Sequence, residues 1–530
     1  MSEKEYRLII MKKLRFLAIL ILLSGFVNHV CAQDEKIDSA AFRKIRKAEL
    51  SDSHIPQIAF NLTDAAGSRL TNSPGFFRAG NWAVETMKKW GLVNAALEPW
   101  GDYGRGWEVE DFSISMKAPY PGYVIGYPMP WSANTDGEIH APVFAVLTTD
   151  LLDSAFLEKH EDDFKGKIIL LTNSGTKHEE DFKPFSTRLT DSALLKMHDD
   201  YMLTRKQLEG YLKPLAMIDR GMLKLKSSGA LAIVDANGSH RDGTVTVQSF
   251  FGYKTNRPVF LPEAVISAED GFKIKRLLYS GHTVELSLNI KGKFYANDTR
   301  GYNVVAEIPG ADPTLKAQVV MLGGHLDSWA AATGATDNGA GCMVMMEAVR
   351  LLDSLHLQPR RTIRIVLWSG EEEGLLGSYA YVKNHFGNAE SGSLKPEQAN
   401  VSVYFNLDNG TGKIRGIYAQ GNTAVKPIFE KWFRPFNDLG AKTVTLSNTG
   451  STDHLSFDWA GIPGFQFIQD PLDYEEKTHH TNMDTYDYLQ IDDLKQAAII
   501  VASFVYQAST RPDLLPRKKL INEKFVFDGF

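Results

Sequence analysis

The sequence is poor in cysteine, in unbalanced charge and in long apolar runs, and each shortage excludes a class of protein. Only Cys31 and Cys342 occur in 530 residues, which excludes a disulfide scaffold. The 58 Lys and Arg residues nearly balance the 64 Asp and Glu residues, and the net charge of −6 argues against a nucleic-acid binder driven by phosphate attraction. After the N-terminal segment, no run is long and apolar enough to predict a membrane span.

The composition that remains is typical of a globular protein. Hydrophobic residues make up 43% of the chain, charged residues 23% and aromatic residues 11%. We find neither internal repeats of about 20–50 residues nor low-complexity tracts. Because single cores stop growing well below this chain length, we expect about two or three domains.

An N-terminal segment has the three parts of a secretory signal. Basic residues precede an apolar stretch at 16–27, and Val-Cys-Ala-Gln follows at 30–33. The apolar stretch is too short to span a bilayer comfortably. We therefore expect a cleaved signal peptide over residues 1–32 and a secreted or periplasmic protein.

Two alternatives concern this segment. Met1 and Met11 are both candidate first residues, because the residues before Met11 look like an upstream extension. Cys31 raises the alternative of a lipoprotein, but residues 28–30 are a poor context for lipidation. Cleavage of the signal would leave Cys342 as the one cysteine, so stability has to come from packing and metal binding rather than from an internal disulfide.

The middle of the chain differs from its flanks in its pattern of expected secondary structure. From about residue 117 to residue 293, short β-like runs surround a polar, helix-prone stretch at 192–226. No run in this part joins acidic and histidine residues at a strand end. We interpret residues 116–294 as an inserted, mainly β module.

From residue 302 onward, the pattern alternates between strand and helix. The expected strands are 319–322, 361–368 and 401–407, and the expected helices are 341–355, 373–384, 424–439 and 492–507. Such alternation predicts an α/β fold with a doubly wound, mostly parallel sheet flanked by helices. Ligands of such sheets lie beyond the carboxyl ends of the strands.

Acidic and histidine residues follow the expected strands or precede the next helix. These residues are His325 and Asp327, Asp337, the run Glu371-Glu372-Glu373, and Asp408. Each is ambiguous alone, since an Asp before a helix is usually a cap and acids suit a helix start. Together, in one crevice, they would repel one another or be desolvated unless a cation neutralised them.

Nitrogen and carboxylate donors without thiolates suit zinc or a similar divalent ion. Asp327 could accept the second ring proton of His325 and fix its tautomer. A further ligand is needed to complete two metal shells, and either His479 or His480, in a loop before the last helix, could supply it.

Competing motifs are incomplete. Residues 160–164 and 178–182 each lack the second His of the helical zinc-protease motif. The chain has no Gly-x-Ser-x-Gly elbow, and residues 410–413 lack the full spacing of a phosphate loop.

The ordered motifs resemble the co-catalytic zinc exopeptidases of clan MH. The matched segments are Gly-His-Leu-Asp-Ser at 324–328, Ala-Thr-Asp-Asn-Gly-Ala-Gly at 335–341, Glu-Glu-Glu-Gly-Leu-Leu-Gly-Ser at 371–378, Asn-Leu-Asp at 406–408 and His-His-Thr at 479–481. The resemblance covers residues 33–115 and 295–510, as the two parts of a catalytic domain reaching residue 530. Residues 68–75 and 479–485 lean towards the carboxypeptidase Q branch, whose members carry a protease-associated domain where the insert lies.

The resemblance implies a ligand set for two zinc ions. One zinc would be held by His325 and Asp408, the other by Glu372 and His480, with Asp337 bridging them. It further implies Glu371 as the general base and places Asp327 at a catalytic-motif position beside the metals. Because three glutamates are adjacent, the match to the family motif can shift by one residue, so the roles of base and ligand could be exchanged between Glu371 and Glu372.

The function implied is an exported exopeptidase that hydrolyses short peptides through a hydroxide shared by two zinc ions. It would act as an aminopeptidase, or as a dipeptidase or carboxypeptidase of carboxypeptidase Q type, with the attacked terminus left open. The alternatives are a one-zinc enzyme like glutaminyl cyclase and a catalytically dead binding protein, and the complete ligand set argues against both. The insert could cover the pocket or mediate a homodimer.

Overall fold

A computed structural model of the chain describes residues 35–177, 182–200, 205–388 and 391–518. The predicted signal peptide, residues 1–32, lies outside the described residues. Residues 1–38 form a separate unit, and the sheets and helices described belong to the compact unit that begins at Ser39. Within the described ranges, none of the helices has the length and hydrophobicity needed to cross a membrane.

The first sheet has eight strands, and its centre is parallel. In spatial order the strands are β1 (Val93–Asp102), β10 (Arg300–Ile308), β12 (Thr362–Trp368), β11 (Val319–His325), β15 (Val401–Asn406), β18 (Gly464–Gln469), β16 (Ile414–Tyr418) and β17 (Thr443–Thr445). The central strands β12, β11, β15 and β18 run parallel, whereas β10 and β16 pair antiparallel with their inner neighbours.

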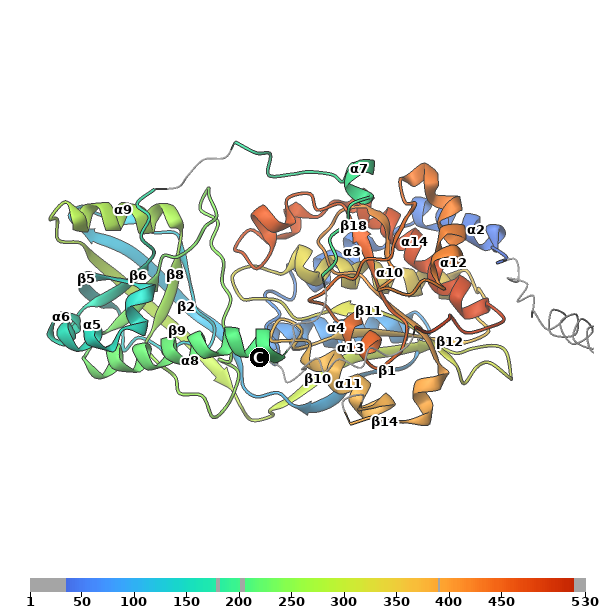
Figure 1. The fold of residues 1–530 in the computed structure, drawn as a ribbon, viewed down its shortest axis with the longest axis horizontal. Coiled ribbons are helices and arrows are strands. Elements are labelled where there is room, and N and C mark those ends of the chain that lie inside the picture. The colour runs from blue at the N-terminus through green and yellow to red at the C-terminus, as the bar shows by residue number, and fades with distance from the viewer. Residues whose placement is uncertain (1–34, 178–181, 201–204, 389–390, 519–530) are drawn as a thin grey trace, which may run out of the picture. The chain divides into compact units, whose positions relative to one another are not determined.

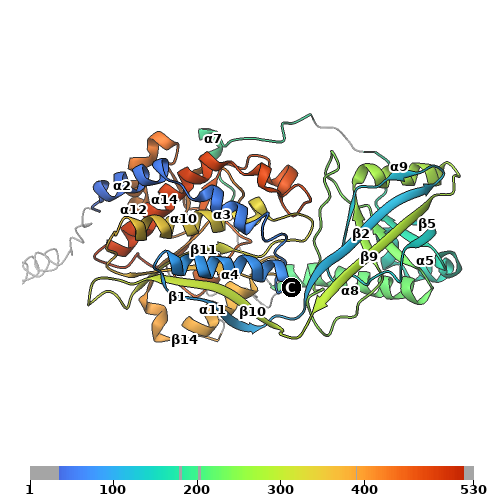
Figure 2. The same cartoon turned by 180° about the vertical axis from the view of Figure 1, so that it is seen from behind.

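Helices cover both faces of this sheet because its central strands are apolar on both sides. Tyr404 of β15 stacks on Phe457 of α13 (His454–Trp459), with ring centroids 4.2 Å apart. The next residue, Phe405, points to the opposite face and contacts Phe504 of α14 (Ile491–Thr510). On the α13 side lies α11 (Leu376–Phe386), and on the α14 side lie α2 (Ser39–Ser51), α3 (Ile55–Leu62), α4 (Pro74–Lys89), α10 (Ala340–Ser354) and α12 (Lys426–Phe433) (Figures 1 and 2).

A second eight-stranded sheet is formed by the chain between β1 and β10. Its spatial order is β3 (Gly122–Tyr123), β2 (Gly106–Ala118), β9 (Glu285–Tyr295), β5 (Ile139–Leu147), β6 (Ile168–Thr172), β7 (Ala232–Asp235), β8 (Glu263–Ile266) and β4 (Gly126–Pro128). The long strands β2 and β9 pair antiparallel side by side, as Figure 2 shows. The strands β5, β6, β7 and β8 are parallel.

The inserted module, residues 106–295, is not built from strands alone. Met222 and Leu225 of α8 (Arg205–Ser227) pack in the same core cluster as Ile169 of β6. Ile274 of α9 (Ala268–Tyr279) packs with Ile168, which points to the other face of the same strand. We expected a mainly β module, but helices lie on both faces because β6 and β7 are apolar on both sides.

The expected boundary of the insert at residue 116 lies inside β2. All of β2, from Gly106 onward, pairs with β9 in the second sheet, and β1 and β10 pair with each other in the first. The identification of this module as a protease-associated domain stays a prediction.

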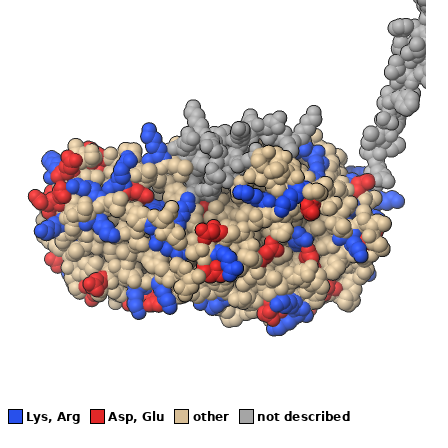
Figure 3. Space-filling model, turned by 90° about the horizontal axis from the view of Figure 1, so that it is seen from below, with Lys and Arg blue, Asp and Glu red and all other residues tan. Residues whose placement is uncertain are grey.

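The predicted α/β fold is confirmed. The expected strands at 319–322, 361–368 and 401–407 correspond to β11, β12 and β15. The sheet is mixed rather than uniformly parallel, because β10 and β16 pair antiparallel with strands that are distant in the sequence, and local periodicity does not reveal such pairing. On the face drawn in Figure 3, basic and acidic side chains of the described residues are interspersed, as the balanced composition predicts.

Candidate metal centre

The carboxyl ends of three neighbouring parallel strands carry the predicted site residues. β11 ends at His325, which lies in register with Trp368, the last residue of β12. Glu371 and Glu372 come just after β12, and Asp408 comes just after β15. Because parallel strands end at one edge of a sheet, these side chains meet there although they are far apart in the sequence.

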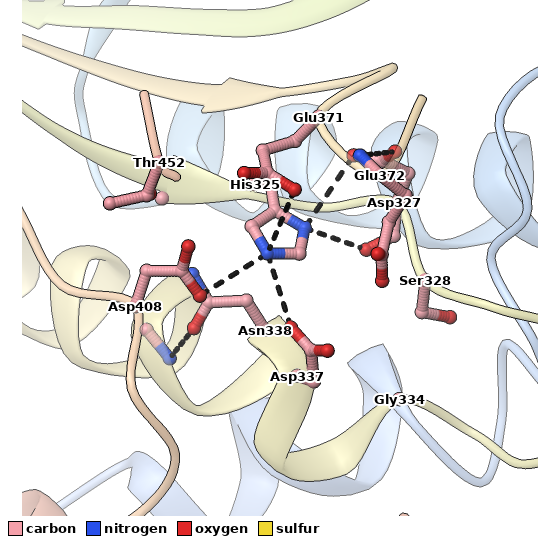
Figure 4. A network of polar contacts seen from close by, with 12 residues as sticks. His325, Asp327, Ser328, Gly334, Asp337, Asn338, Glu371, Glu372, Asp408 and Thr452 are labelled. Atoms are coloured by element: carbon pink, nitrogen blue, oxygen red, sulfur yellow. Dashed lines mark hydrogen bonds and ion pairs between the residues drawn. The ribbon is translucent and has the colours of Figure 1, made fainter. Parts of the chain in front are cut away.

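His325 lies at the centre of the first group of side chains (Figure 4). Its Nε2 atom is 3.3 Å from Oδ1 of Asp408 and 3.3 Å from Oδ1 of Asp337. Oε2 of Glu371 is 3.8 Å from the same nitrogen. Potential ligand atoms of His325, Glu371 and Asp408 all lie within 4.8 Å of one another, a spacing that one metal ion could bridge.

The other ring nitrogen orients the imidazole, and here one sequence interpretation is corrected. Nδ1 of His325 lies 3.0 Å from the backbone carbonyl oxygen of Asp327 and 3.6 Å from Oδ1 of its carboxylate. The carbonyl is the nearer acceptor because the chain turns after β11 and brings it within hydrogen-bond distance of Nδ1. With Nδ1 donating, Nε2 keeps its lone pair for the centre of the group.

The carboxylate of Asp327 instead organises the loop after β12. It accepts hydrogen bonds from the hydroxyl of Thr71 (3.0 Å) and from the backbone N–H of Glu372 (3.4 Å). The Thr71 hydroxyl also accepts from the backbone N–H of Gly370 (2.9 Å). Thr71 therefore connects the N-terminal part of the chain to the strand ends.

His480 and Glu372 form the second group together with Asp337. Nε2 of His480 is 2.9 Å from Oε2 of Glu372 and 3.3 Å from Oδ2 of Asp337. Asp337 thus presents one oxygen to His325 and the other to His480. His479 is the more distant and more exposed of the two histidines, since its Nε2 is 3.9 Å from Asp337 and its side chain is 35% exposed against 17% for His480.

Asp337 is held from two sides by residues around it. The carboxylate of Asp484 accepts the backbone N–H groups of Thr336 (2.6 Å) and Asp337 (3.1 Å). The side chain of Asn338 donates to the backbone carbonyl of Leu407 (2.9 Å), one residue before Asp408. These contacts fix the shared carboxylate relative to both groups.

Arg69 is a buried cation that sequence reasoning did not assign to the site. It is fully buried, and its guanidinium donates to the backbone carbonyls of Leu62, Leu326, Thr333 and Gly334. It therefore clamps both ends of the loop between His325 and Asp337. The signal available was its place in the segment at 68–75, which matched a family motif without indicating a role.

The electrostatics of the site show an excess of carboxylates. Burial raises the pKa of Glu371 well above its usual value, and nearby Asp408 raises it further against the opposing effect of His325. Burial and then Asp337 likewise raise the pKa of Glu372. Burial also favours neutral Asp337, but its hydrogen bond to His325 and the charge of His480 hold its pKa below the usual range. Without added positive charge, the cluster cannot keep all its carboxylates ionised at neutral pH.

The donor set fits divalent metal ions. Oδ2 of Asp337 and Oε1 of Glu372 are buried oxygens with no hydrogen-bond partner among the described residues. The donors are imidazole and carboxylate, which suits zinc. The thiol of Cys342 is not a suitable metal ligand. It donates to the backbone carbonyl of His325, and burial raises its pKa to about 12, so it stays protonated.

Comparisons with known proteins identify peptidases that are similar to this chain. Residues 303–505 match the family model of Peptidase family M28. Carboxypeptidase Q of Pongo abelii is 32% identical over 257 residues, which are 48% of this chain and 52% of the relative, so the alignment spans about half the length of that protein.

Two solved structures share the fold. The crystal structure of the Peptidase M28 precursor from Shewanella amazonensis SB2B superposes with a TM-score of 0.66 at 24% identity, covering 91% of this chain and 98% of that one. BSAP, a zinc aminopeptidase from Bacillus subtilis, superposes with a TM-score of 0.53 at 20% identity, covering 87% and 98%. The region that carries His325, Asp337, Glu371, Glu372, Asp408 and His480, residues 303–505, belongs to peptidase family M28.

Proposed function

We propose that the chain is a di-zinc metallo-exopeptidase that hydrolyses short peptides. One observation carries the proposal: Asp337 faces two groups of donors at once, with Oδ1 3.3 Å from Nε2 of His325 and Oδ2 3.3 Å from Nε2 of His480. A carboxylate with one oxygen toward each group could be a ligand of two adjacent metal ions. The names of similar proteins, carboxypeptidase Q and a zinc aminopeptidase, support the same activity.

In this proposal the chain supplies two ligand sets and a base. His325 and Asp408 bind one zinc, Glu372 and His480 bind the other, and Asp337 serves both. Bound zinc would lower the pKa of water toward neutrality and polarise the scissile carbonyl.

Glu371 is the proposed general base. Its carboxylate lies at the edge of the first group, 3.8 Å from Nε2 of His325, and its side chain is 10% exposed. From this position it would take a proton from the attacking water and pass it to the leaving amine. Asp327 would act indirectly, because its carboxylate holds the N–H of Glu372 and its carbonyl orients His325.

A peptide panel tests the activity. Purified protein is incubated with dipeptides and tripeptides whose amino or carboxyl termini are free or blocked, and released amino acids are measured with and without a zinc chelator. We expect cleavage that one blocked terminus abolishes and that chelation removes, and the terminus concerned decides between aminopeptidase and carboxypeptidase. Binding of peptides without any cleavage by zinc-loaded protein would instead favour a dead binding protein, and cyclisation of N-terminal glutamine would favour a glutaminyl cyclase.

We also propose that the protein is exported, which rests on the signal-like sequence at residues 1–32. N-terminal sequencing of protein from the exported fraction of an expressing bacterium should give a mature start after Ala32. An unprocessed protein that stays with the cytoplasmic fraction would contradict export and leave the peptidase proposal untouched.

A further inference from the structure

A short segment of the inserted module, Gly243–Val247, lies against the loop that carries His480. We call it the brace segment. Val245 and Val247 are fully buried and share a small core cluster with Val265 of β8, so the brace segment is anchored in the second sheet. Tyr127 and Met129 of the inserted module pack against the same cluster, and so does Ala331 from the loop after β11.

The brace segment pairs with the histidine loop, Thr478–Asp484, through the backbone. The N–H of Val247 donates to the carbonyl of His480 (2.9 Å), and Thr246 and Thr481 form an antiparallel β-bridge. His480 itself has a φ of +59°, a conformation uncommon for residues other than glycine. The hydrogen bond to its carbonyl helps to hold that conformation.

Asn482 extends this pairing with its side chain. Its Oδ1 accepts the N–H of Val245 (2.7 Å), its Nδ2 donates to the carbonyl of Gly243 (3.2 Å), and its own N–H donates to the carbonyl of Val245 (3.1 Å). Asn482, two residues after His480, therefore makes three hydrogen bonds to a segment of the inserted module.

The same loop also fixes Asp337, the carboxylate shared by the two groups. Asp484, two residues after Asn482, accepts the N–H groups of Thr336 and Asp337. The histidine loop thus contains His480, pairs with the brace segment and holds Asp337 through Asp484.

We propose that Asn482 is a positioning residue through which the inserted module sets the second metal-binding group. The inference rests on the proposed function, because it assigns a role toward the zinc that His480 and Glu372 would hold. It gives the insert a task beyond covering a pocket or forming a dimer: the module is part of the scaffold of the metal centre.

The test compares Asn482→Ala with a matched control in the same full-length protein. Asn134 makes the same kind of contact inside the insert, since its side chain donates to the carbonyl of Gly292 (3.0 Å) and accepts its N–H (2.8 Å). Asn134→Ala therefore removes a like pair of hydrogen bonds without touching the histidine loop. Zinc affinity is measured by competition with a chromophoric chelator, and urea unfolding of metal-free protein measures stability.

We expect Asn482→Ala to lower the affinity for one of two zinc ions by about 10–100-fold, the usual effect of removing a group that supports a metal ligand. Asn134→Ala should leave the affinity for both zinc ions unchanged. Asn482→Asp retains the acceptor but opposes an oxygen to Gly243, so it should weaken the same zinc and serves if Asn482→Ala fails to fold. Wild-type affinity at both sites in Asn482→Ala, or equal weakening in the control, would overturn the inference alone. A wild-type protein that binds no zinc would overturn the proposed function together with it.

Discussion

The two sheets of this protein share a plan and differ in the side chains at the ends of their strands. Each has eight strands with four parallel strands at its centre, and each has helices on both faces. In the first sheet, the strand ends carry His325, Glu371, Glu372 and Asp408. In the second, Thr148, Asn173 and Ser267 come directly after β5, β6 and β8, and β7 ends at Asp235, whose carboxylate accepts hydrogen bonds from Asn237. Among the described residues, the carboxyl ends of these four strands thus carry one carboxylate and no histidine.

Each sheet also has a buried cation that holds a loop after a strand. Arg69 donates to carbonyls in the loop after β11, and Lys275 of α9 donates to the carbonyls of Asn173 and Gly175 after β6. The loop geometry is therefore supported in similar ways in both regions. The comparison teaches that the carboxyl edge of a parallel sheet can hold a binding or catalytic site, and that the side chains at the strand ends decide whether it does.

Metal removal should have the largest effect, and this effect should arise at the first sheet, whose strand ends carry the proposed zinc ligands. Chelation is expected to abolish peptidase activity and to lower the free energy of unfolding by about 4 kcal/mol per zinc site when zinc had been present at about 1,000 times its Kd. Activity assays and urea unfolding, with and without chelator, measure both effects, and added zinc should restore them. Unchanged activity in fully metal-free protein would contradict the di-zinc proposal.

A Glu→Gln substitution at each sheet compares a proposed catalytic carboxyl group with one outside the metal centre. Glu371→Gln should lower kcat by about 100- to 10,000-fold, the usual contribution of a general base, while zinc content stays at the wild-type level. Glu263→Gln, in β8 of the second sheet, serves as the matched control and should keep wild-type kcat. Full activity of Glu371→Gln would show that the base is assigned to the wrong residue.

The buried cations can be compared in the same way. Arg69→Met leaves four backbone carbonyls without their donor and should lower the free energy of unfolding by about 3 kcal/mol or more. Lys275→Met removes the donor of two carbonyls and should cost about 1–2 kcal/mol. Urea unfolding of metal-free protein measures both, and a larger loss for Lys275→Met would reverse the comparison.

The last comparison concerns a pH dependence of stability that belongs to the second sheet. Burial, and then nearby Asp235, raise the pKa of Glu263 to about 8. Between about pH 4.5 and pH 8 the folded protein keeps a proton on Glu263 that the unfolded chain has released. The contribution of this group therefore makes the protein less stable as the pH rises through that window.

Glu263→Gln should remove this slope and stabilise the protein most at pH 8 and above. Unfolding free energies of wild type and variant at pH 5, 6.5 and 8 measure the difference. Two curves that stay parallel across this range would mean that Glu263 is ionised in the folded protein at neutral pH.

Much of the fold and the site could be predicted from the sequence. The central strands β11, β12 and β15 are continuous apolar runs, so their pattern is visible locally. The residue types of His325, Asp337 and Asp408 suit a metal, whereas the choice of Glu372 and His480 as ligands came from the family resemblance. Their roles as metal ligands stay a prediction. The antiparallel outer strands, the start of the insert at Gly106 and helix α9 of the insert were not predicted, whereas the helix-prone stretch at 192–226 overlaps α8. These features depend on pairing between β2 and β9, or between β1 and β10, which are separated by nearly two hundred residues.

By itself, the sequence determined which side chains are available and the order of strands and helices that carries them, because local periodicity and residue chemistry are properties of short segments. Only the tertiary structure decided that the backbone carbonyl of Asp327, and not its carboxylate, orients His325, that Arg69 clamps the loop before Asp337, and that Asn482 ties the histidine loop to the insert. These are contacts between groups whose positions depend on the packing of distant segments, and no local pattern encodes them.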